Sequence, residues 1–236
     1  MRVLVIPDIH LKPWIFDQAI EILESGKCER AVCVGDLVDD WGHESNLELY
    51  EETLKKAIAF AKRYPDTLWC YGNHELAYIW GKYEHSGYSE EAEGLVCEYL
   101  GILDETVAPG NLAVVHRIDN VIFSHAGIIR EFVDYWLPNY GDDVDAVIAA
   151  INESSDNILW EGTSPLWTRP QDGFRKAGIF APDYLQVVGH TPVRSIMSQG
   201  SLLSTDTFST FSNGRPIGNE EMCWVDTVTK DWGLVE

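Results

Sequence analysis

Three short apolar runs in the first third of the chain predict strands that are buried on both faces. They cover residues 2–6, 30–34 and 67–71, and none alternates strictly between apolar and polar positions. Two stretches between them, 14–25 and 47–64, carry apolar residues at helical spacing. Strands and helices that alternate in this order predict a βαβαβ unit, and therefore an α/β fold with a parallel sheet.

The rest of the chain is predicted to contain more strands. Residues 112–116 and 121–124 are expected to form a hairpin, and helices are expected over 90–100 and 142–153. Further strands are expected over 184–189, 193–197, 201–204, 222–228 and 232–235. Two segments lack a regular pattern: 78–93, which is either a lid or a surface connection, and the polar loop 207–221.

Five polar segments each end or follow one of the apolar runs. They read Asp8-Ile9-His10, Gly35-Asp36-Leu37-Val38-Asp39, Gly72-Asn73-His74-Glu75, Ser124-His125-Ala126-Gly127 and Gly189-His190-Thr191. Because parallel strands end at one edge of a sheet, where α/β proteins bind ligands, these side chains are expected to share a cleft. The segments come from both halves of the chain, so residues 1–236 are expected to form a single domain.

The side chains of this set suit a pair of divalent metal ions. Carboxylate, amide oxygen and imidazole ligands favour Mn, Fe or Zn over Mg or Ca, which prefer shells made only of oxygen. We take Mn as the first candidate. One carboxylate shared by two ions holds them about 3.5–4 Å apart, and Asp36 is the candidate for that position. Paired ions clamp phosphorus-centred substrates and generate hydroxide from water near neutral pH.

A second pair of residues predicts a proton donor. Asp39 lies one turn beyond the candidate bridging residue, and His74 is adjacent to the candidate ligand Asn73. A carboxylate that orients an imidazolium makes a competent general acid. Each motif alone is more often a turn or a helix cap, so the metal prediction depends on their joint occurrence. The remaining histidines lack such a context and are expected at the surface or in the core, with His43 close enough to line the cleft; they are His43, His85 and His116.

Charge and cysteine content narrow the class of protein. The formal net charge of -21 disfavours nucleic acids and anionic membranes as general partners. The five cysteines are odd in number and form no C-x-x-C, so we expect reduced thiols and a cytoplasmic location. The apolar run at the N-terminus is too short for a signal peptide, and no run is long enough to cross a bilayer. Phosphate-binding loops, dinucleotide fingerprints and G-x-S-x-G elbows do not occur in the sequence.

With these motifs the chain resembles the calcineurin-like metallophosphoesterase superfamily, over a match from Asp8 to about Asp206. Within it, four segments resemble the phosphoprotein phosphatase branch, which includes bacterial Ser/Thr phosphatases and symmetrical diadenosine tetraphosphatases. They are Gly72-Asn73-His74-Glu75, Ser124-His125-Ala126-Gly127, Leu166-Trp167-Thr168-Arg169-Pro170 and Gly189-His190-Thr191-Pro192. The resemblance implies a four-layer α/β/β/α sandwich, with two mixed sheets flanked by helices.

The resemblance also implies roles for individual residues. Asp8, His10 and Asp36 would hold one metal, and the second metal would be held by Asp36, Asn73, His125 and His190. The implied reaction is in-line attack by a metal-bridging hydroxide, without a phosphoenzyme. His74 would protonate the leaving oxygen, Asp39 would orient His74, and Arg169 would contact the phosphate.

Two positions depart from the family pattern. Pro7-Asp8-Ile9-His10-Leu11 replaces the usual Gly-Asp-x-His-Gly, and Asp39-Asp40-Trp41-Gly42 replaces a motif that continues Asp-Arg-Gly. Asp40 therefore stands where the family has an arginine that grips phosphate, and an acid that pointed inward would repel a phosphate dianion. We expect a phosphomonoesterase acting on proteins or small molecules. The alternatives are a nucleotide phosphodiesterase, a dinucleoside polyphosphate hydrolase, or a catalytically weak protein that binds a partner.

Overall fold

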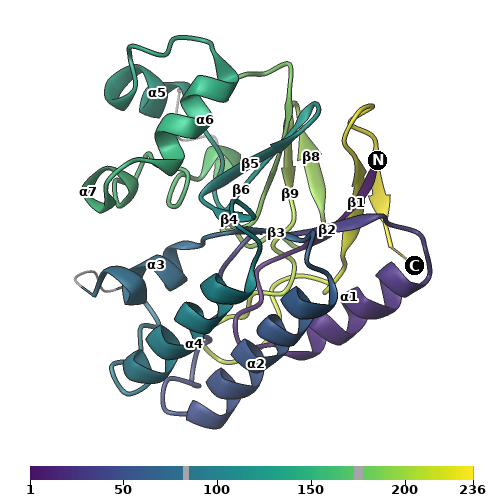
Figure 1. Ribbon diagram of the computed structural model, residues 1–236, viewed down its shortest axis with the longest axis vertical. Coiled ribbons are helices and arrows are strands. Elements are labelled where there is room, and N and C mark those ends of the chain that lie inside the picture. Colours follow the sequence, from purple (N-terminus) through teal and green to yellow (C-terminus); the bar gives the residue numbers. More distant parts are fainter. Residues whose placement is uncertain (82–84, 173–177, 236) are drawn as a thin grey trace.

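Two mixed β-sheets pack face to face, and helices cover the outer face of each (Figure 1). The computed structural model describes residues 1–81, 85–172 and 178–235. Apolar side chains of both sheets, among them Val5, Val32, Phe123 and Val187, meet in a buried layer between them. The layers follow the order α/β/β/α, which confirms the predicted four-layer fold.

The first sheet has the strand order β11-β10-β1-β2-β3-β4. Its strands are β1 (Arg2–Ile6), β2 (Arg30–Cys33), β3 (Leu68–Cys70), β4 (Leu112–Ala113), β10 (Cys223–Asp226) and β11 (Trp232–Leu234). Strands β1 to β4 run parallel, and β10 pairs antiparallel with both β1 and β11. The predicted βαβαβ unit is confirmed, with its three strands as neighbours.

The second sheet has the strand order β5-β6-β7-β9-β8. Its strands are β5 (Val115–Ile118), β6 (Val121–Ser124), β7 (Leu185–Val188), β8 (Met197–Gln199) and β9 (Leu202–Ser204). Strands β6, β7 and β9 run parallel, and β5 and β8 are antiparallel at the edges. Three parallel strands of this sheet therefore end at the same edge, where turns that carry ligands can meet.

Two strand predictions are corrected by the structure. The predicted strand 112–116 divides into β4, which joins the first sheet, and β5, which joins the second. A continuous apolar run does not reveal that the chain crosses between sheets at this point. The strand predicted over 193–197 is wrong, because Val193 and Ile196 are buried in a loop and β8 begins only at Met197.

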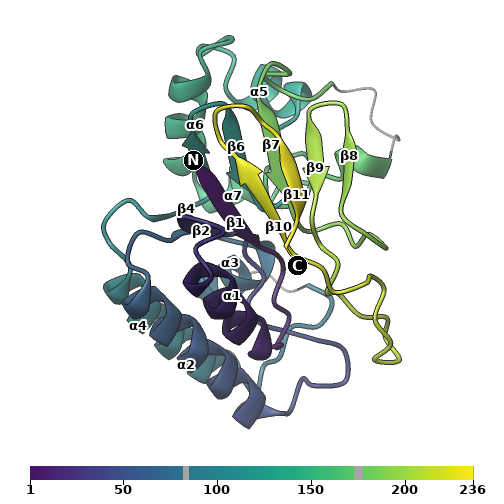
Figure 2. The ribbon, with the colours of Figure 1, turned by 90° about the vertical axis from the view of Figure 1, so that its right-hand side faces the viewer.

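Helices cover both outer faces. Those on the first sheet are α1 (Trp14–Glu24), α2 (Leu47–Arg63) and α4 (Glu93–Thr106), and α2 and α4 lie side by side in both views (Figure 2). Those on the second sheet are α5 (Arg130–Trp136), α6 (Val144–Asn152) and α7 (Asp156–Leu159). Helix α3 (Asn73–Trp80) follows β3, and a 3-10 turn, η1, spans Pro170–Asp172.

Helix α3 extends into the segment 78–93, of which residues 82–84 lie outside the described residues. Its polar start at Asn73 belongs to a ligand motif, so the sequence did not predict it as a helix. Across the described ranges, no helix combines the length and hydropathy needed to cross a bilayer.

Candidate metal centre

The turns after five strands bring the predicted polar side chains to one place. Asp8 follows β1, Asp36 follows β2 and Asn73 follows β3. His125 follows β6 and His190 follows β7. These strands run parallel within each sheet, so their carboxyl ends meet where the two sheets adjoin. The predicted clustering of the five segments is thus observed.

Several of these turn residues have a left-handed backbone. The φ angle is 42° at His10, 50° at Asp36, 65° at Asp39 and 61° at His190. A residue with a Cβ pays roughly 1–2 kcal/mol for this conformation, which persists only where the surrounding structure fixes it. Such strain is concentrated at functional sites, and here it directs four side chains from three turns into one cleft.

Glu75 holds the second and third turns together. Its buried carboxyl group accepts hydrogen bonds from the backbone N–H of Gly72 at 2.8 Å and of Asp36 at 3.0 Å. The same bond to Gly72 caps the start of helix α3. A Cβ at Gly72 would lie 2.1 Å from Asp36 Oδ1, so this close approach of the two turns requires glycine.

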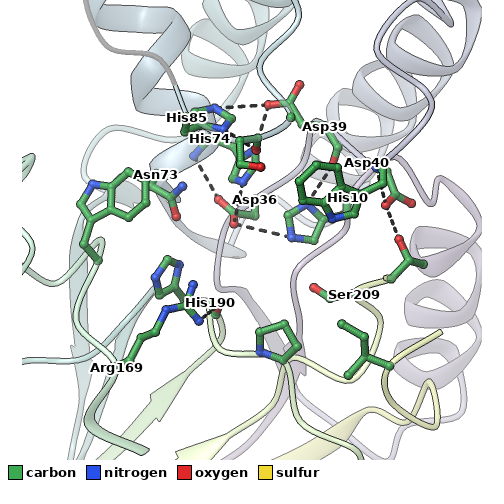
Figure 3. A pocket seen from close by; sticks show the side chains of 17 residues that line it. His10, Asp36, Asp39, Asp40, Asn73, His74, His85, Arg169, His190 and Ser209 are labelled. Atoms are coloured by element: carbon green, nitrogen blue, oxygen red, sulfur yellow. Dashed lines mark hydrogen bonds and ion pairs between the residues drawn. The ribbon is translucent and has the colours of Figure 1, made fainter. Parts of the chain in front are cut away.

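Asp36 lies in the middle of the cleft, with imidazole rings on several sides (Figure 3). Its Oδ2 is 3.2 Å from His125 Nε2, 3.7 Å from His10 Nε2 and 3.8 Å from His74 Nε2. Two groups of side chains spaced to hold a metal share it, one with His10 and His74 and one with His125 and His190. A carboxylate common to two such groups is the geometry expected of a bridging ligand.

Backbone carbonyl groups orient two of the imidazoles. His125 Nδ1 lies 2.9 Å from Val34 O, and His10 Nδ1 lies 2.8 Å from Asp39 O, so each Nδ1 carries the proton. Their Nε2 atoms are left to face Asp36. A donated N–H that fixes the tautomer is typical of histidines that bind metal.

Asn73 and His190 complete the second group. His125 Nε2 lies 3.0 Å from Asn73 Oδ1 and 3.1 Å from His190 Nδ1. Burial lowers the pKa of His190 well below its ordinary value, and His125 adds to this, so the His190 ring is neutral and available as a ligand. An amide oxygen and two imidazole nitrogens therefore converge beside the shared carboxylate.

A buried oxygen of Asp8 fits the presence of a cation. Asp8 Oδ1 has no hydrogen-bond partner among the described residues. The other oxygen of Asp8 accepts the backbone N–H of His190 at 2.8 Å. A Cβ at Gly189 would lie 1.8 Å from Asp8 Oδ1, so glycine leaves room for this carboxylate. A buried polar atom without a partner is costly, and metal coordination would satisfy this carboxylate oxygen.

The charges of the cleft also favour cations. Burial raises the pKa of Asp8 well above its ordinary value, and the neighbouring Asp206 raises it further. Burial opposes a charge on His125, yet Asp36 raises the pKa of His125 to about 10. Neighbouring buried carboxylates contribute to both shifts, and positive ions would balance that negative charge. Asp206 was not predicted as a site residue, because it follows β9 without a recognisable motif.

The predicted pair of Asp39 and His74 is in contact. His74 Nδ1 lies 2.8 Å from Asp39 Oδ2, and His74 Nε2 faces Asp36. Burial opposes a charge on His74, but Asp36 and Asp39 together raise its pKa above the ordinary value. Tyr50 and Tyr78 donate their hydroxyl protons to Asp39 Oδ1 at 2.6 Å and 2.7 Å. Tyr50 lies in the helix predicted over 47–64, and the apolar spacing of that stretch gave no sign of these bonds.

One histidine lies where the sequence did not predict it. His85 packs against His74 with ring centroids 3.9 Å apart, and its Nε2 is 3.4 Å from Asp39 Oδ2. Burial lowers the pKa of His85 to about 4. His116 is a buried core histidine, as expected, and His43 is not among the described residues that line the cavity. The position of His85 depends on a loop that carries no motif.

Asp40 faces the cavity, but its charge is paired. Its carboxylate lies 2.8 Å from the Lys12 ammonium and also accepts the hydroxyl proton of Thr210. Burial opposes ionisation of Asp40, and Lys12 lowers the pKa below the ordinary value, so the group stays ionised beside its counterion. The repulsion that the sequence suggested for a phosphate dianion is therefore largely offset.

A cavity of about 280 Å³ opens over the centre, lined by residues of the turns after β1, β2, β3 and β7. Arg169 lies at its wall beside His190, and its guanidinium donates to His190 O at 3.1 Å and to Thr191 Oγ1 at 3.3 Å. Figure 3 shows Arg169 and His190 on one side of Asp36, and Asp39 and His85 on the other. A phosphate group in this cavity would meet a cationic side chain opposite the Asp39–His74 pair.

The chain is similar to several solved structures. A protein serine/threonine phosphatase from Saccharomyces cerevisiae, described as similar to a human phosphatase, matches with a TM-score of 0.53 at 15% identity, covering 95% of this chain and 72% of that one. A metallophosphoesterase from Sphaerobacter thermophilus gives 0.46 at 15% identity, covering 100% and 88%. An archaeal phosphodiesterase gives 0.40 at 15% identity, covering 100% and 99%. Comparison with curated protein sequences found no match.

The family model for calcineurin-like phosphoesterases matches residues 1–206, which is most of the chain and includes every ligand turn described above. That family comprises metal-dependent hydrolases that act on phosphate esters. The fold, the convergent turns and this match lead to one assignment: the chain belongs to the calcineurin-like phosphoesterase family.

Proposed function

We propose that the protein is a dinuclear metal-dependent phosphoesterase that hydrolyses phosphomonoesters, of a phosphoprotein or of a small molecule. The observation that carries the proposal is the position of Asp36, whose carboxylate is shared by two groups of potential metal ligands. We assign Asp8, His10 and Asp36 to one metal. The residues assigned to the other metal are Asp36, Asn73, His125 and His190.

When bound, such a pair of ions supplies Lewis acidity toward phosphate oxygens and lowers the pKa of water. Manganese is the first candidate, since the ligand set mixes nitrogen and oxygen; iron and zinc are the alternatives. Around the ions, the chain itself supplies orientation and charge. Asp8, Asp36 and Asp206 are all buried within the site, which makes the cleft a strong trap for cations.

His74 is proposed to donate a proton to the leaving oxygen. Its Nε2 faces the centre, and its Nδ1 is held by Asp39 at 2.8 Å. A proton at Nε2 is thereby directed at the position where a leaving group departs. Arg169, which lines the cavity, is proposed to bind the phosphate oxygens through charge-assisted hydrogen bonds.

One observation favours the alternative of a nucleotide phosphodiesterase or dinucleoside polyphosphate hydrolase. Among the described residues that line the cavity, Arg169 is the one with a permanent positive charge. Asp40 occupies the place of a second cation, and its pairing with Lys12 leaves that wall close to neutral. A phosphodiester carries one charge fewer per phosphorus than a monoester dianion, so it needs less compensation.

The experiment compares hydrolysis of p-nitrophenyl phosphate with that of bis-p-nitrophenyl phosphate, using protein stripped of metal and reloaded with Mn²⁺. Metal-dependent turnover that is faster on the monoester supports the proposal, and faster turnover on the diester supports the alternative. If neither p-nitrophenyl substrate, nor phosphopeptides, nor nucleotides showed metal-dependent turnover, the result would instead favour the alternative of a catalytically weak protein that binds a partner.

Location and partners are part of the proposal. All five cysteines are free thiols, four of them buried, which is consistent with a cytoplasmic protein. The net charge of -21 would repel nucleic acid from most of the surface, so the expected partner is a phosphate-ester substrate, either a phosphoprotein or a small molecule.

A further inference from the structure

His85 presents a buried nitrogen atom that no hydrogen bond satisfies. Its side chain is 3% exposed, and its Nε2 has no hydrogen-bond partner among the described residues. The nearest charged atom is Asp39 Oδ2, at 3.4 Å. Because two tyrosine hydroxyls already donate to Oδ1 of Asp39, Oδ2 is the oxygen left to face the histidines.

The tautomer of His85 leaves its Nε2 with a lone pair and no proton. Its Nδ1 lies 3.0 Å from Ser86 O, an acceptor, so Nδ1 carries the ring proton. The Nε2 of a neutral ring then directs a lone pair at a carboxylate oxygen. Two electron-rich atoms this close require a positive charge between them, either a second ring proton or a cation. A second ring proton is disfavoured by burial and by His74, whose ring centroid is 3.9 Å away.

The spacing fits a metal ion. Zinc binds nitrogen and oxygen at about 2.0–2.1 Å in a tetrahedron, which puts two ligands about 3.3–3.4 Å apart. The distance between His85 Nε2 and Asp39 Oδ2 is 3.4 Å. Asp39, His74 and His85 offer ligand atoms that all lie within 4.8 Å of one another. His74 Nδ1 would complete this group once its proton is lost.

We propose that Asp39, His74 and His85 form a third cation site, separate from the two metal positions around Asp36, which takes Zn²⁺ and is inhibitory. Binding releases the Nδ1 proton of His74 to solvent and replaces the hydrogen bond between His74 and Asp39 with two bonds to zinc. His74 is then no longer held as a proton donor. Two imidazoles and one carboxylate prefer zinc to manganese, so the site distinguishes the inhibitor from the activating metal. The inhibition rests on the proposed function, whereas the binding does not.

The test counts zinc ions. The whole, metal-stripped protein is dialysed to equilibrium against Zn²⁺, and bound zinc is measured for the wild type and for His85→Phe, which keeps an aromatic ring but no ligand. We expect three equivalents in the wild type and two in His85→Phe. His43→Phe serves as the matched control and should bind three. His85→Cys, which restores a zinc ligand, should also bind three. Circular dichroism verifies that each variant is folded.

A kinetic arm tests inhibition. Zn²⁺ is added to Mn²⁺-loaded protein, and each variant's initial rate is divided by its own zinc-free rate. We expect the zinc concentration for half-inhibition to rise at least tenfold in His85→Phe and to stay unchanged in His43→Phe. If the wild type and His85→Phe bound equal numbers of zinc ions and were inhibited at the same zinc concentration, the third site would be overturned. The proposed phosphoesterase function would not be affected by that result. If His85→Phe bound one zinc ion fewer but no form of the protein showed turnover, the third cation site would be supported and the proposed phosphoesterase function would be rejected.

Discussion

The Lys12 ammonium lies 2.8 Å from the Asp40 carboxylate, and both side chains are nearly buried, at 11% and 12% exposed. This pair joins the turn after β1 to the turn after β2, and Asp40 itself lines the cavity. Asp40 stands where related sequences are expected to have a phosphate-binding arginine. The ion pair leaves this wall close to neutral, so the cavity neither attracts nor repels phosphate there.

Lys12→Met would leave Asp40 as an uncompensated anion facing the substrate. We expect KM for a phosphomonoester dianion to rise about tenfold, which corresponds to about 1.4 kcal/mol, and KM for a diester monoanion to rise less. Steady-state kinetics on the two p-nitrophenyl substrates checks this. Lys55→Met, on the exposed face of α2, is the control. Equal effects on both substrates would show that Lys12 acts through folding and not through charge.

Asp40 also gives a prediction for acid stability. Lys12 lowers its pKa in the folded protein, so the carboxylate stabilises the fold above its ordinary pKa of 3.8, and this contribution is lost as the pH falls below that value. The free energy of unfolding of metal-stripped Asp40→Asn should lie below that of the wild type at pH 6, and the gap should close as the pH falls from about 4 toward 3. Urea unfolding at several pH values measures the gap. A constant gap over this range, or a similar closing gap in the exposed control Asp104→Asn, would contradict the assignment.

Tyr78 is expected to act as a positioning residue through Asp39. Tyr78→Phe removes one of two hydroxyl donors to Asp39 Oδ1, which weakens the hold on His74. We expect kcat on phenyl phosphate, a substrate with a poor leaving group, to fall about tenfold, with a much smaller change on p-nitrophenyl phosphate. A general acid matters most when the leaving oxygen is basic, so this contrast separates positioning from a merely structural loss.

Tyr135→Phe, a change at a residue 74% exposed on α5, is the matched control and should alter neither substrate. If Tyr78→Phe lowered kcat equally on both substrates, the hydroxyl would be structural only.

His74→Asn separates a proton donor from a metal ligand. The His74 ring lies close enough to Asp36 and His10 to be grouped with them as a metal site, yet its other nitrogen is held by Asp39. We expect two Mn²⁺ ions to remain bound and kcat to fall by about 10²–10⁴-fold. Metal analysis alongside kinetics decides between the roles: loss of one Mn²⁺ would make His74 a ligand.

Much of the fold and most of the site followed from local patterns. The polar positions Asp8, Asp36 and Asn73 are predictable from the sequence. A buried parallel strand is a plain apolar run, so the polar residue that follows it marks where the strand ends. Asp39 and His74 followed from the same turns. The motif is informative because all its members lie within a few residues of a strand end.

What the sequence could not supply are contacts between distant segments. His85 lies against Asp39 only because residues 85–87 line the cleft, and the Lys12–Asp40 pair forms only when two turns adjoin. Val114 lies where an unbroken apolar run passes from one sheet to the other, and no local feature marks that point. Such relationships depend on tertiary packing and are absent from periodicity.

The central claim is that Asp36 is shared by two metal ions, and counting bound manganese tests it most directly. Metal-stripped wild type and Asp36→Asn are dialysed against Mn²⁺, with Asp104→Asn as the control, and bound metal is measured. We predict two equivalents in the wild type and in Asp104→Asn, with neither ion retained at full occupancy in Asp36→Asn. A wild type that binds one equivalent, or an Asp36→Asn variant that keeps two, would contradict the dinuclear centre proposed for this protein.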